Sequence, residues 1–297
     1  MKNGITIFTP TYNRAYVLDR LYESLLKQTD KRFEWVIVDD GSTDNTKALA
    51  ESWIAEKKIT IRYYYQENAG KMQAHNKGTE LAEYELFCCV DSDDYLTYNA
   101  VEKILSCWGR KGINKKIIGL LNFRLTAQGG RVSSGHLKNV VGRTCTLYDA
   151  YRKYGLNGDT MLIYRTEVIK QHHFPQFEGE KFVPESYLYD QLDQDGKIYV
   201  QGEKLYVCEY LPDGYTASIR KTNHDNPRGY EAYIIQRLNL DKKYKDRVLD
   251  TIRFIAIELV LKADKKDVLS RTPYKTLVNV MMPAGKRFYD KVYKQFD

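Results

Sequence analysis

Short apolar runs alternate with amphipathic segments along the first ninety residues of the chain. The apolar runs have the length of buried strands, and they occupy residues 5–8, 33–38, 59–65 and 85–90. Between them, apolar side chains recur at helical spacing within residues 17–28, 44–53 and 73–82. Because strand and helix alternate with a period of about thirty residues, we expect parallel strands joined by right-handed crossovers, and therefore an α/β fold.

The alternation loosens after residue 95. Further strands are predicted at residues 117–123 and 161–164, a hairpin turn at 128–130, and helices at 100–108, 166–171 and 185–192. Two short strands are expected within residues 198–207, on either side of Gly202. The last segment, residues 226–297, repeats apolar side chains at helical spacing and predicts a helical tail.

Three of the predicted strands end in polar clusters, at residues 9–12, 39–42 and 91–94. In an open parallel sheet, ligands bind at the carboxyl ends of the strands. We therefore expect all three clusters to face one crevice.

The third cluster brings Asp91, Asp93 and Asp94 together after a strand that reads as buried on both faces. Because strand side chains alternate, Asp91 and Asp93 are expected on the same side of the chain. Two like charges repel each other unless a cation lies between them, and Mg²⁺ or Mn²⁺ bridging to a diphosphate fits such a pair. The alternative is that these carboxylates cap and begin the next helix.

The composition is that of a globular protein with one large or two small domains. The 297 residues are 43% hydrophobic and 29% charged. We find no apolar run long enough to span a membrane and no signal-peptide core, and we expect a cytoplasmic protein. The five cysteines lack C-x-x-C spacing, so we interpret them as small core residues in a reducing compartment.

The net charge of +7 lies entirely in the last quarter of the chain. Residues 1–225 hold 30 Lys and Arg against 30 Asp and Glu, whereas residues 226–297 hold 16 against 9. This tail fits an anionic inner membrane surface, and the alternative is that its helices pack on the rest of the chain or form a homodimer contact. No nucleic-acid-binding motif accompanies the charge, so no nucleic-acid partner is expected.

Four motifs in order resemble glycosyltransferase family 2. They are Thr-Pro-Thr-Tyr-Asn-Arg at 9–14, Val-Asp-Asp-Gly-Ser-Thr-Asp at 38–44, Asn68-x-Gly-Lys71 with Ala74-His-Asn-x-Gly78, and Val-Asp-Ser-Asp-Asp at 90–94. A dinucleotide G-x-G-x-x-G and a P-loop are both missing. The resemblance is strong over residues 5–95 and weaker to about residue 222.

The resemblance implies a GT-A fold: a Rossmann-like mixed sheet flanked by helices, here with a C-terminal helical tail. It divides the chain into a nucleotide-sugar-binding half at 1–98, an acceptor-binding half at 99–225 and the basic tail at 226–297. It also implies an inverting transfer of a hexosyl or N-acetylhexosaminyl group from a nucleotide-diphosphate sugar, with UDP favoured. The acceptor would be a glycan or a lipid-linked oligosaccharide.

Matched residue by residue, the first two motifs are similar to the part of the family that holds the nucleoside. Thr9, Pro10 and Tyr12 correspond to the contacts of uracil and ribose, with Tyr12 stacking on the base. Asp40 corresponds to the acceptor of the hydrogen bond from the base N3–H. Capping the next helix is the alternative for this segment, although Ser42 and Asp44 suit that role better.

The third and fourth motifs are similar to the family's diphosphate and metal site. Lys71 corresponds to a basic group near the base or diphosphate, or is simply a solvated lysine, and Asn76 supports the loop. Asp93 corresponds to the metal ligand and Asp91 to the residue that bridges ribose and metal, with Ser92 between them. The implied cofactor is Mn²⁺ or Mg²⁺, which would neutralise charge on the departing diphosphate.

An inverting transfer needs a general base for the acceptor hydroxyl. The family takes it from an acidic pair at the start of a helix, and Glu185 in Pro184-Glu-Ser-Tyr is the nearest match. Glu180 is the rival candidate. Because this region departs from the family pattern, a non-catalytic nucleotide-sugar binder remains an alternative, as does an interaction module built on the tail.

Overall fold

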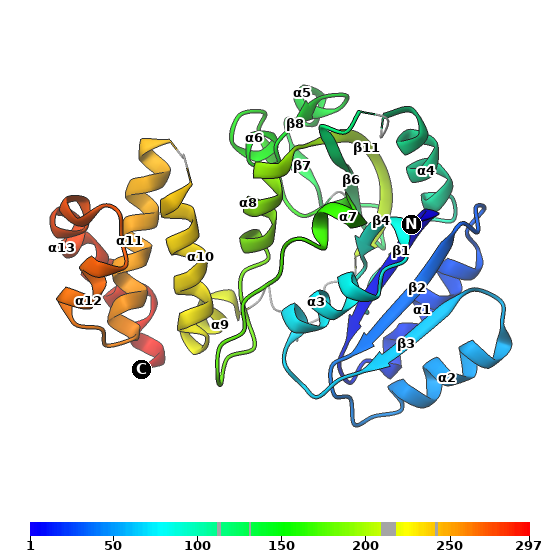
Figure 1. Ribbon diagram of the computed structural model, residues 1–297, viewed down its shortest axis with the longest axis horizontal. Coiled ribbons are helices and arrows are strands. Elements are labelled where there is room, and N and C mark those ends of the chain that lie inside the picture. Colours follow the sequence, from blue (N-terminus) through cyan, green and yellow to red (C-terminus); the bar gives the residue numbers. More distant parts are fainter. Residues whose placement is uncertain (112–113, 131, 209–217, 241–242) are drawn as a thin grey trace. The chain divides into compact units, whose positions relative to one another are not determined.

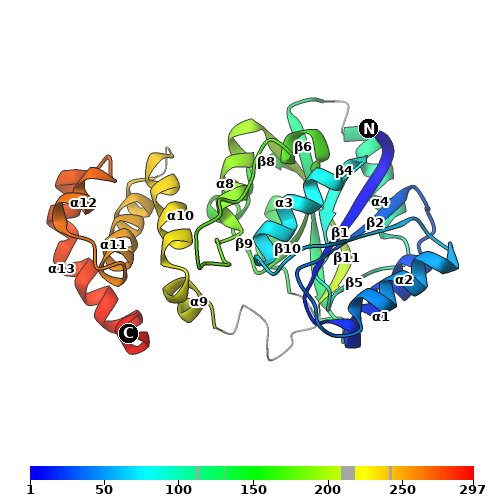
Figure 2. The same cartoon turned by 60° about the horizontal axis from the view of Figure 1, so that its bottom comes forward.

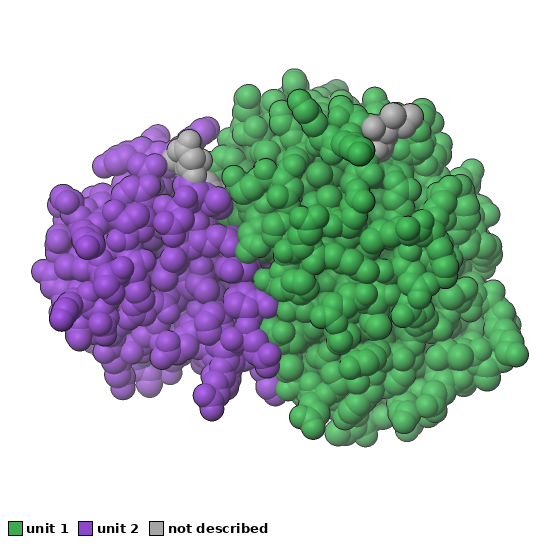
Figure 3. Space-filling model, viewed as in Figure 1, with its two compact units in different colours: residues 1–173, 188–211 green, residues 174–187, 212–297 purple. Residues whose placement is uncertain are grey.

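The computed structural model describes residues 1–111, 114–130, 132–208, 218–240 and 243–297. The chain divides into two compact units (Figure 3). Residues 1–173 and 188–211 form the first, here named the sheet unit. Residues 174–187 and 212–297 form the second, here named the helical unit. The segment 174–187 therefore groups with the C-terminal helices although it lies between elements of the sheet unit in sequence.

The sheet unit is built around a mixed sheet. Among the described residues its strands follow the order β3, β2, β1, β4, β10, β6, β11 and β5, with β8 beside β11. The strands are β1 Lys2–Thr11, β2 Phe33–Asp39, β3 Ile61–Tyr65, β4 Tyr84–Cys89, β5 Tyr95–Leu96, β6 Ile117–Thr126, β8 Thr144–Cys145, β10 Thr160–Arg165 and β11 Lys197–Cys208. A separate small pair joins β7 Ser134–Gly135 to β9 Leu156–Asn157.

The helices of the sheet unit lie mainly between these strands in sequence. They are α1 Ala15–Leu26, α2 Thr46–Glu56, α3 Lys71–Leu81, α4 Ala100–Lys111, α5 Leu137–Val140, α6 Leu147–Arg152, α7 Thr166–Ile169 and α8 Ser186–Asp195. As predicted, β3, β2, β1 and β4 pair in parallel. The mixed character comes from β10, which runs antiparallel to both β4 and β6.

Helices cover both faces of the first four strands (Figure 1 and Figure 2). Helices α1, α2 and α4 share one core with the strand residues Ile5, Ile7 and Ile37. The opposite face packs against α3, which approaches β1 so closely that a Cβ at Gly78 would lie 2.3 Å from the ring of Phe8. Only glycine allows this approach, and the helix is therefore held tightly against the sheet.

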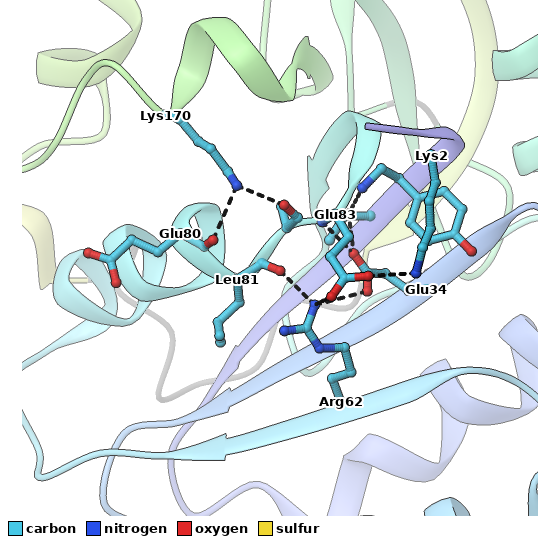
Figure 4. Close-up of polar contacts among 10 residues, drawn as sticks. Lys2, Glu34, Arg62, Glu80, Leu81, Glu83 and Lys170 are labelled. Atoms are coloured by element: carbon cyan, nitrogen blue, oxygen red, sulfur yellow. Dashed lines mark hydrogen bonds and ion pairs between the residues drawn. The ribbon is translucent and has the colours of Figure 1, made fainter.

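The amino ends of the same strands are joined by a buried acid (Figure 4). Glu34 is 1% exposed, and its carboxylate accepts hydrogen bonds from the Thr6 hydroxyl at 2.7 Å and the Glu83 backbone N–H at 2.8 Å. Arg62 lies 3.3 Å from Glu34 and 3.0 Å from the Glu83 carboxylate. A buried charge costs stability unless it is paired in this way, so the network supports a single strand alignment.

One strand prediction is corrected. The two short strands expected around Gly202 are a single strand, β11, which pairs in parallel with β6 on both sides of the glycine. The register with β6 shifts between Val200 and Lys204. This irregularity accommodates the glycine, and the strand continues beyond it. The predicted hairpin turn is present, with the Thr126 N–H donating to the Gly130 carbonyl.

The helical unit has a core of its own. Its helices are α9 Ile219–Asp225, α10 Pro227–Asn239, α11 Tyr244–Val260, α12 Lys265–Ser270, α13 Lys275–Val292 and the short 3-10 helix Lys294–Phe296. Phe254, Ile255 and Ile257 of α11 are 0–1% exposed and pack with Ile234 of α10 and Val278 of α13. Across the described residues, the helices are too short or too polar to cross a bilayer.

Candidate active site

The three polar clusters follow strands that end at one edge of the sheet. In the parallel pairing, Thr11 of β1 lies beside Asp39 of β2, and Phe8 lies beside Cys89 of β4. The backbone pairing continues past the strands, because the Asp40 N–H donates to the Thr11 carbonyl at 2.8 Å. The loops after β1, β2 and β4 are therefore neighbours, as parallel topology requires.

Asp40 is held by the loop that leads into α3. Its Oδ1 accepts hydrogen bonds from Gln66 Nε2 at 2.8 Å and from the Ala69 N–H at 2.9 Å. Its Oδ2 accepts one from the Gly70 N–H at 2.8 Å. The carboxylate is 4% exposed, and its orientation is set by three donors. A carboxylate offers about four lone-pair sites, so one further donor can still be accepted.

The loop after β1 presents one ring to solvent. Tyr12 is 49% exposed, which leaves its face open for stacking. Thr9 and Pro10 are buried, and the Thr9 hydroxyl accepts a hydrogen bond from Trp35 Nε1 at 2.9 Å inside the core. A nucleotide contact by Thr9 would therefore involve its backbone, a constraint that sequence spacing did not reveal.

Two cations face Asp91. Lys71 Nζ, from the first residue of α3, lies 2.8 Å from Asp91 Oδ1. Arg124 Nη1, from β6, lies 4.0 Å from Asp91 Oδ2 and 3.9 Å from Asp94 Oδ2. Burial alone would raise the pKa of Asp91, but the Lys71 ammonium and the Arg124 guanidinium outweigh it and hold that pKa below its usual value. Asp91 is therefore a stable anion.

A tyrosine completes this cluster from β11. The Tyr206 hydroxyl accepts a hydrogen bond from the Asp91 N–H at 3.0 Å, and the Arg124 guanidinium lies 4.1 Å from the centre of the Tyr206 ring. The sequence reasoning missed Arg124 and Tyr206. The signal for Arg124 was a lone cation directly after an apolar strand, but only the pairing of β11 with β6 and of β6 with β10 shows where it lies.

The carboxylates after β4 lie in a turn, contrary to the expected strand alternation. The strand ends at Cys89, and the Asp94 N–H donates to the Asp91 carbonyl at 3.1 Å. Asp94 is 5% exposed beside Arg124, six residues before α4 begins at Ala100, so it does not cap that helix. Burial and the neighbouring charge of Asp91 raise the pKa of Asp94 to about 7. Asp93 is less buried and lies at the tip of the turn.

A divalent cation fits this turn on the chemistry of its oxygens. Burial and the Asp91 charge both raise the pKa of Asp93, a repulsion that a cation between the two would relieve. Among the residues with described positions, no group of three His, Cys, Asp or Glu side chains is arranged to hold an ion. Mg²⁺ commonly binds one or two carboxylates together with substrate phosphates, so a two-carboxylate site matches that pattern.

The remaining predicted nucleotide contacts lie on or near α3 and the turn. Asn76 donates to Gln73 Oε1 at 3.2 Å within α3, and Ser92 is 7% exposed. His75 is 9% exposed and packs edge-on against the rings of Phe8 and Phe87, at 5.6 and 5.4 Å between centroids. Its contacts are those of a core residue.

Both candidate bases belong to the helical unit. Glu185 is exposed and directly precedes α8, as expected from the sequence. Glu180 instead binds backbone: its Oε1 accepts from the Arg228 N–H at 2.9 Å and its Oε2 from the Gly229 N–H at 2.8 Å. The structure thus gives Glu180 a capping role at the start of α10, and the assignment of Glu185 as the base stays a prediction.

The arrangement defines a GT-A fold, with a mixed sheet, an acidic turn after β4 and polar loops at the carboxyl ends of β1 and β2. Residues 6–113 match the model of glycosyl transferase family 2, and this part of the chain belongs to that family. Glycosyltransferase GlyG of Streptococcus pneumoniae is 36% identical over 105 residues, which are 35% of this chain and 35% of GlyG. The chain thus covers about a third of that relative.

Solved structures extend the likeness in fold to nearly the whole chain. TarS 1-349 of S. aureus in complex with UDP-GlcNAc has a TM-score of 0.67 at 19% identity, covering 99% of this chain and 92% of TarS. The mannosyltransferase PcManGT of Pyrobaculum calidifontis, in complex with GDP-Man and Mn²⁺, has a TM-score of 0.57 at 14% identity, covering 99% and 89%. The predicted family and fold are confirmed.

Proposed function

We propose that this chain is an inverting glycosyltransferase that moves a hexosyl or N-acetylhexosaminyl group from a UDP-sugar to a hydroxyl of a glycan or lipid-linked acceptor. One observation carries the proposal: a continuous set of contacts joins two strand ends. Asp40 binds the Gly70 N–H, and the next residue, Lys71, pairs with Asp91. Asp40, which in this proposal recognises the base, is thereby connected to Lys71, which in this proposal faces the diphosphate.

Each part of the donor has a complementary side chain. The open ring of Tyr12 stacks on the base, and Asp40 accepts the base N3–H with its remaining lone pair. The ammonium of Lys71 and the guanidinium of Arg124 attract the diphosphate. The bound UDP-GlcNAc of TarS, which shares the fold, supports UDP as the nucleotide.

Asp93, assisted by Asp91, would hold the divalent cation. When bound, Mn²⁺ or Mg²⁺ supplies Lewis-acid stabilisation of the charge on the leaving diphosphate. Because Lys71 already pairs with one oxygen of Asp91, we assign the direct contact to Asp93. Arg124 and Lys71 add electrostatic stabilisation at the same place.

Glu185 acts as the general base. It takes the proton of the acceptor hydroxyl, whose oxygen attacks the anomeric carbon opposite the departing diphosphate. Glu180 is the less suitable residue, because both of its oxygens already accept backbone hydrogen bonds. In this scheme residues 1–98 bind the nucleotide sugar and residues 99–225 bind the acceptor. We place the enzyme in the cytoplasm, with the tail able to contact an anionic membrane or a second copy.

A panel of nucleotide sugars tests the donor. With Mn²⁺ present, a UDP-sugar at ten times its Kd should stabilise the protein by about 1.4 kcal/mol, and UDP should be released slowly without acceptor. If UDP-sugars stabilise the protein but no UDP is released with any acceptor tested, the chain is a non-catalytic nucleotide-sugar binder. Absence of any nucleotide effect would contradict the donor site and favour an interaction module.

Glu185→Gln tests the base. The amide cannot accept the proton, so turnover should fall about 100-fold or more while donor affinity is retained. Glu178→Gln, an exposed change in the same segment, is the matched control and should stay active. An active Glu185→Gln enzyme would contradict this assignment.

A further inference from the structure

The segment that carries Glu185 is fastened by helix α10 of the helical unit. The chain leaves the sheet unit after His173 and returns to it at Leu188. Residues 174–187 have no helix or strand before α8 begins at Ser186. A segment without regular secondary structure has no hydrogen-bond ladder of its own, so its conformation depends on what it contacts.

The first fastening is the Glu180 carboxylate at the start of α10. The N–H groups of the first helical turn have no intrahelical acceptor, and Glu180 satisfies those of Arg228 and Gly229 at 2.9 and 2.8 Å. A negative charge at a helix N-terminus is also favoured by the helix dipole. The contact therefore anchors residue 180 to the end of α10.

The second fastening is Asn226, directly before α10. Its Oδ1 accepts hydrogen bonds from the N–H groups of Lys181 and Phe182, at 2.8 and 3.1 Å, and its Nδ2 donates to the Thr222 carbonyl at 2.8 Å. The two chains are in close contact here, because a Cβ at Gly229 would lie 2.2 Å from the Phe182 carbonyl oxygen. Glycine at 229 permits this approach.

The third fastening lies beyond Glu185. Gln236 Nε2, two turns further along α10, donates to the Tyr187 carbonyl at 2.8 Å. Phe174 and Tyr187 also pack together, with ring centroids 6.5 Å apart. Glu185 thus lies between Phe182, which bonds to the residue directly before α10, and Tyr187, which bonds to α10 itself. Its backbone is held on each side by contacts that the sheet unit does not supply.

We propose that the helical unit positions the catalytic base, with Glu180, Asn226 and Gln236 as positioning residues that act through Glu185. The inference rests on the proposed function, because it assigns a purpose to the segment only if Glu185 is the base. In this proposal the C-terminal tail contributes to catalysis, because it positions the base. The tail orders the backbone of residues 181–187, so that the Glu185 carboxylate meets the acceptor hydroxyl in one orientation.

Two substitutions test this on the full chain, Asn226→Ala and Gln236→Ala. Neither side chain is able to act as a base, and each is hydrogen-bonded to the backbone of the segment. We expect turnover to fall about tenfold with UDP affinity unchanged, and the pH at which turnover is half-maximal on the acidic side to stay the same. Amide hydrogen exchange of residues 181–187 should accelerate, while exchange in β1 and β4 is unaffected. Asn239→Ala is the control, because that side chain donates to the Ile235 carbonyl within its own helix.

The outcomes separate the positioning role from its alternatives. Unchanged exchange at 181–187 in both variants, or faster exchange with full turnover, would overturn the proposal. If Glu180 were itself the base, Glu180→Gln would abolish the acidic limb of the pH profile; the positioning role predicts a lower plateau with the limb retained. If the wild-type chain transfers no sugar, the proposed function fails, and the exchange data still report whether α10 fastens the segment.

Discussion

Lys71 Nζ lies 2.8 Å from Asp91 Oδ1, joining the first residue of α3 to the turn that follows β4. The ion pair offsets part of the negative charge that the acidic turn concentrates at this place. It also means that the ammonium is already directed at the place where a diphosphate would bind. The pair is partly buried, with side chains 22% and 27% exposed, so solvent weakens it less than a surface pair.

Replacing Lys71 by Met should weaken UDP binding at least tenfold, because a charge-assisted hydrogen bond of about 1.5–3 kcal/mol is lost. Titration calorimetry with UDP measures the change. Lys77→Met is the matched control on the same helix, since Lys77 pairs with Glu80 on the exposed surface. Equal UDP affinity in wild type and Lys71→Met would exclude Lys71 from the donor site.

Asp93→Ala should remove most activity and the metal dependence of UDP binding while leaving the fold intact. Asp93 lies at the tip of a turn, and the substitution relieves repulsion with Asp91, so no loss of stability is expected. UDP titrations with and without Mn²⁺ and a thermal melt are the measurements. Full activity of this variant, or of the wild type in EDTA, would contradict the metal assignment.

Arg124→Met should lower the free energy of unfolding by about 3 kcal/mol, because it leaves the buried carboxylate of Asp94 and the partly buried carboxylate of Asp91 without one of their cations. Adding Asp94→Asn should restore part of that loss by removing one uncompensated charge. Denaturant unfolding of the two single variants and the double variant measures the coupling. Strict additivity would show that Arg124 and Asp94 do not interact. Arg110→Met on the exposed face of α4 is the control.

The helical unit should lose stability as the pH rises from about 4.5 to about 8. Burial in α11, followed by the neighbouring Glu231, raises the pKa of Glu258 from 4.5 to about 8 in the folded state. A folded-state pKa above the unfolded one means that the native state binds the proton more tightly. The contribution is therefore complete below the unfolded pKa and is lost as the pH passes through the folded one.

Glu258→Gln should flatten this dependence, because the amide stays neutral at every pH. Thermal melts followed by circular dichroism at pH 5 and pH 9 compare the two proteins. The variant should lose less of its melting temperature between these pH values than the wild type does. An identical loss would indicate that Arg271, 3.3 Å from Glu258, keeps the carboxylate charged throughout.

The basic tail gives a further prediction about membranes. Ile255 and Ile257 are buried within the helical unit, so lipid contact would depend on exposed lysines rather than on an inserted apolar face. Binding to liposomes should then require anionic lipid and weaken from 0.05 to 0.5 M salt, as the Debye length falls from about 14 to 4 Å. Flotation measures it. Indifference to anionic vesicles would leave the tail with packing or dimer contacts only.

The sequence predicted the fold best where one periodicity dominates. The first four strands and the helices between them follow from local pattern, because each strand is a short apolar run and each helix has an apolar stripe. The position of β10 between β4 and β6 does not follow, since antiparallel insertion depends on pairing between distant segments. The strand break predicted at Gly202 is absent for a related reason. Pairing with β6 on both sides of the glycine outweighs its local tendency to interrupt a strand.

The site was predicted in part for similar reasons. Asp40, Lys71 and Asp91 follow neighbouring strands or open the intervening helix, so order in sequence was enough to bring them together. Arg124 lies on a strand, 33 residues after Asp91, and its role appears only with the sheet order. The capping role of Glu180 likewise depends on α10, which begins 47 residues later. The functional boundaries at residues 98 and 225 stay predictions, because the two units separate by compactness rather than by what they bind.

Gly78 lies where α3 packs on β1, and the same helix begins with Lys71 of the candidate active site. It lies seven residues beyond Lys71 on α3, and any side chain there would meet the ring of Phe8 at 2.3 Å. A helix moves largely as a rigid body. A methyl group at position 78 would push α3 away from Phe8, and the same displacement would move the Lys71 ammonium away from Asp91. A substitution of Gly78, which does not itself contact the donor, would therefore change the affinity for the donor.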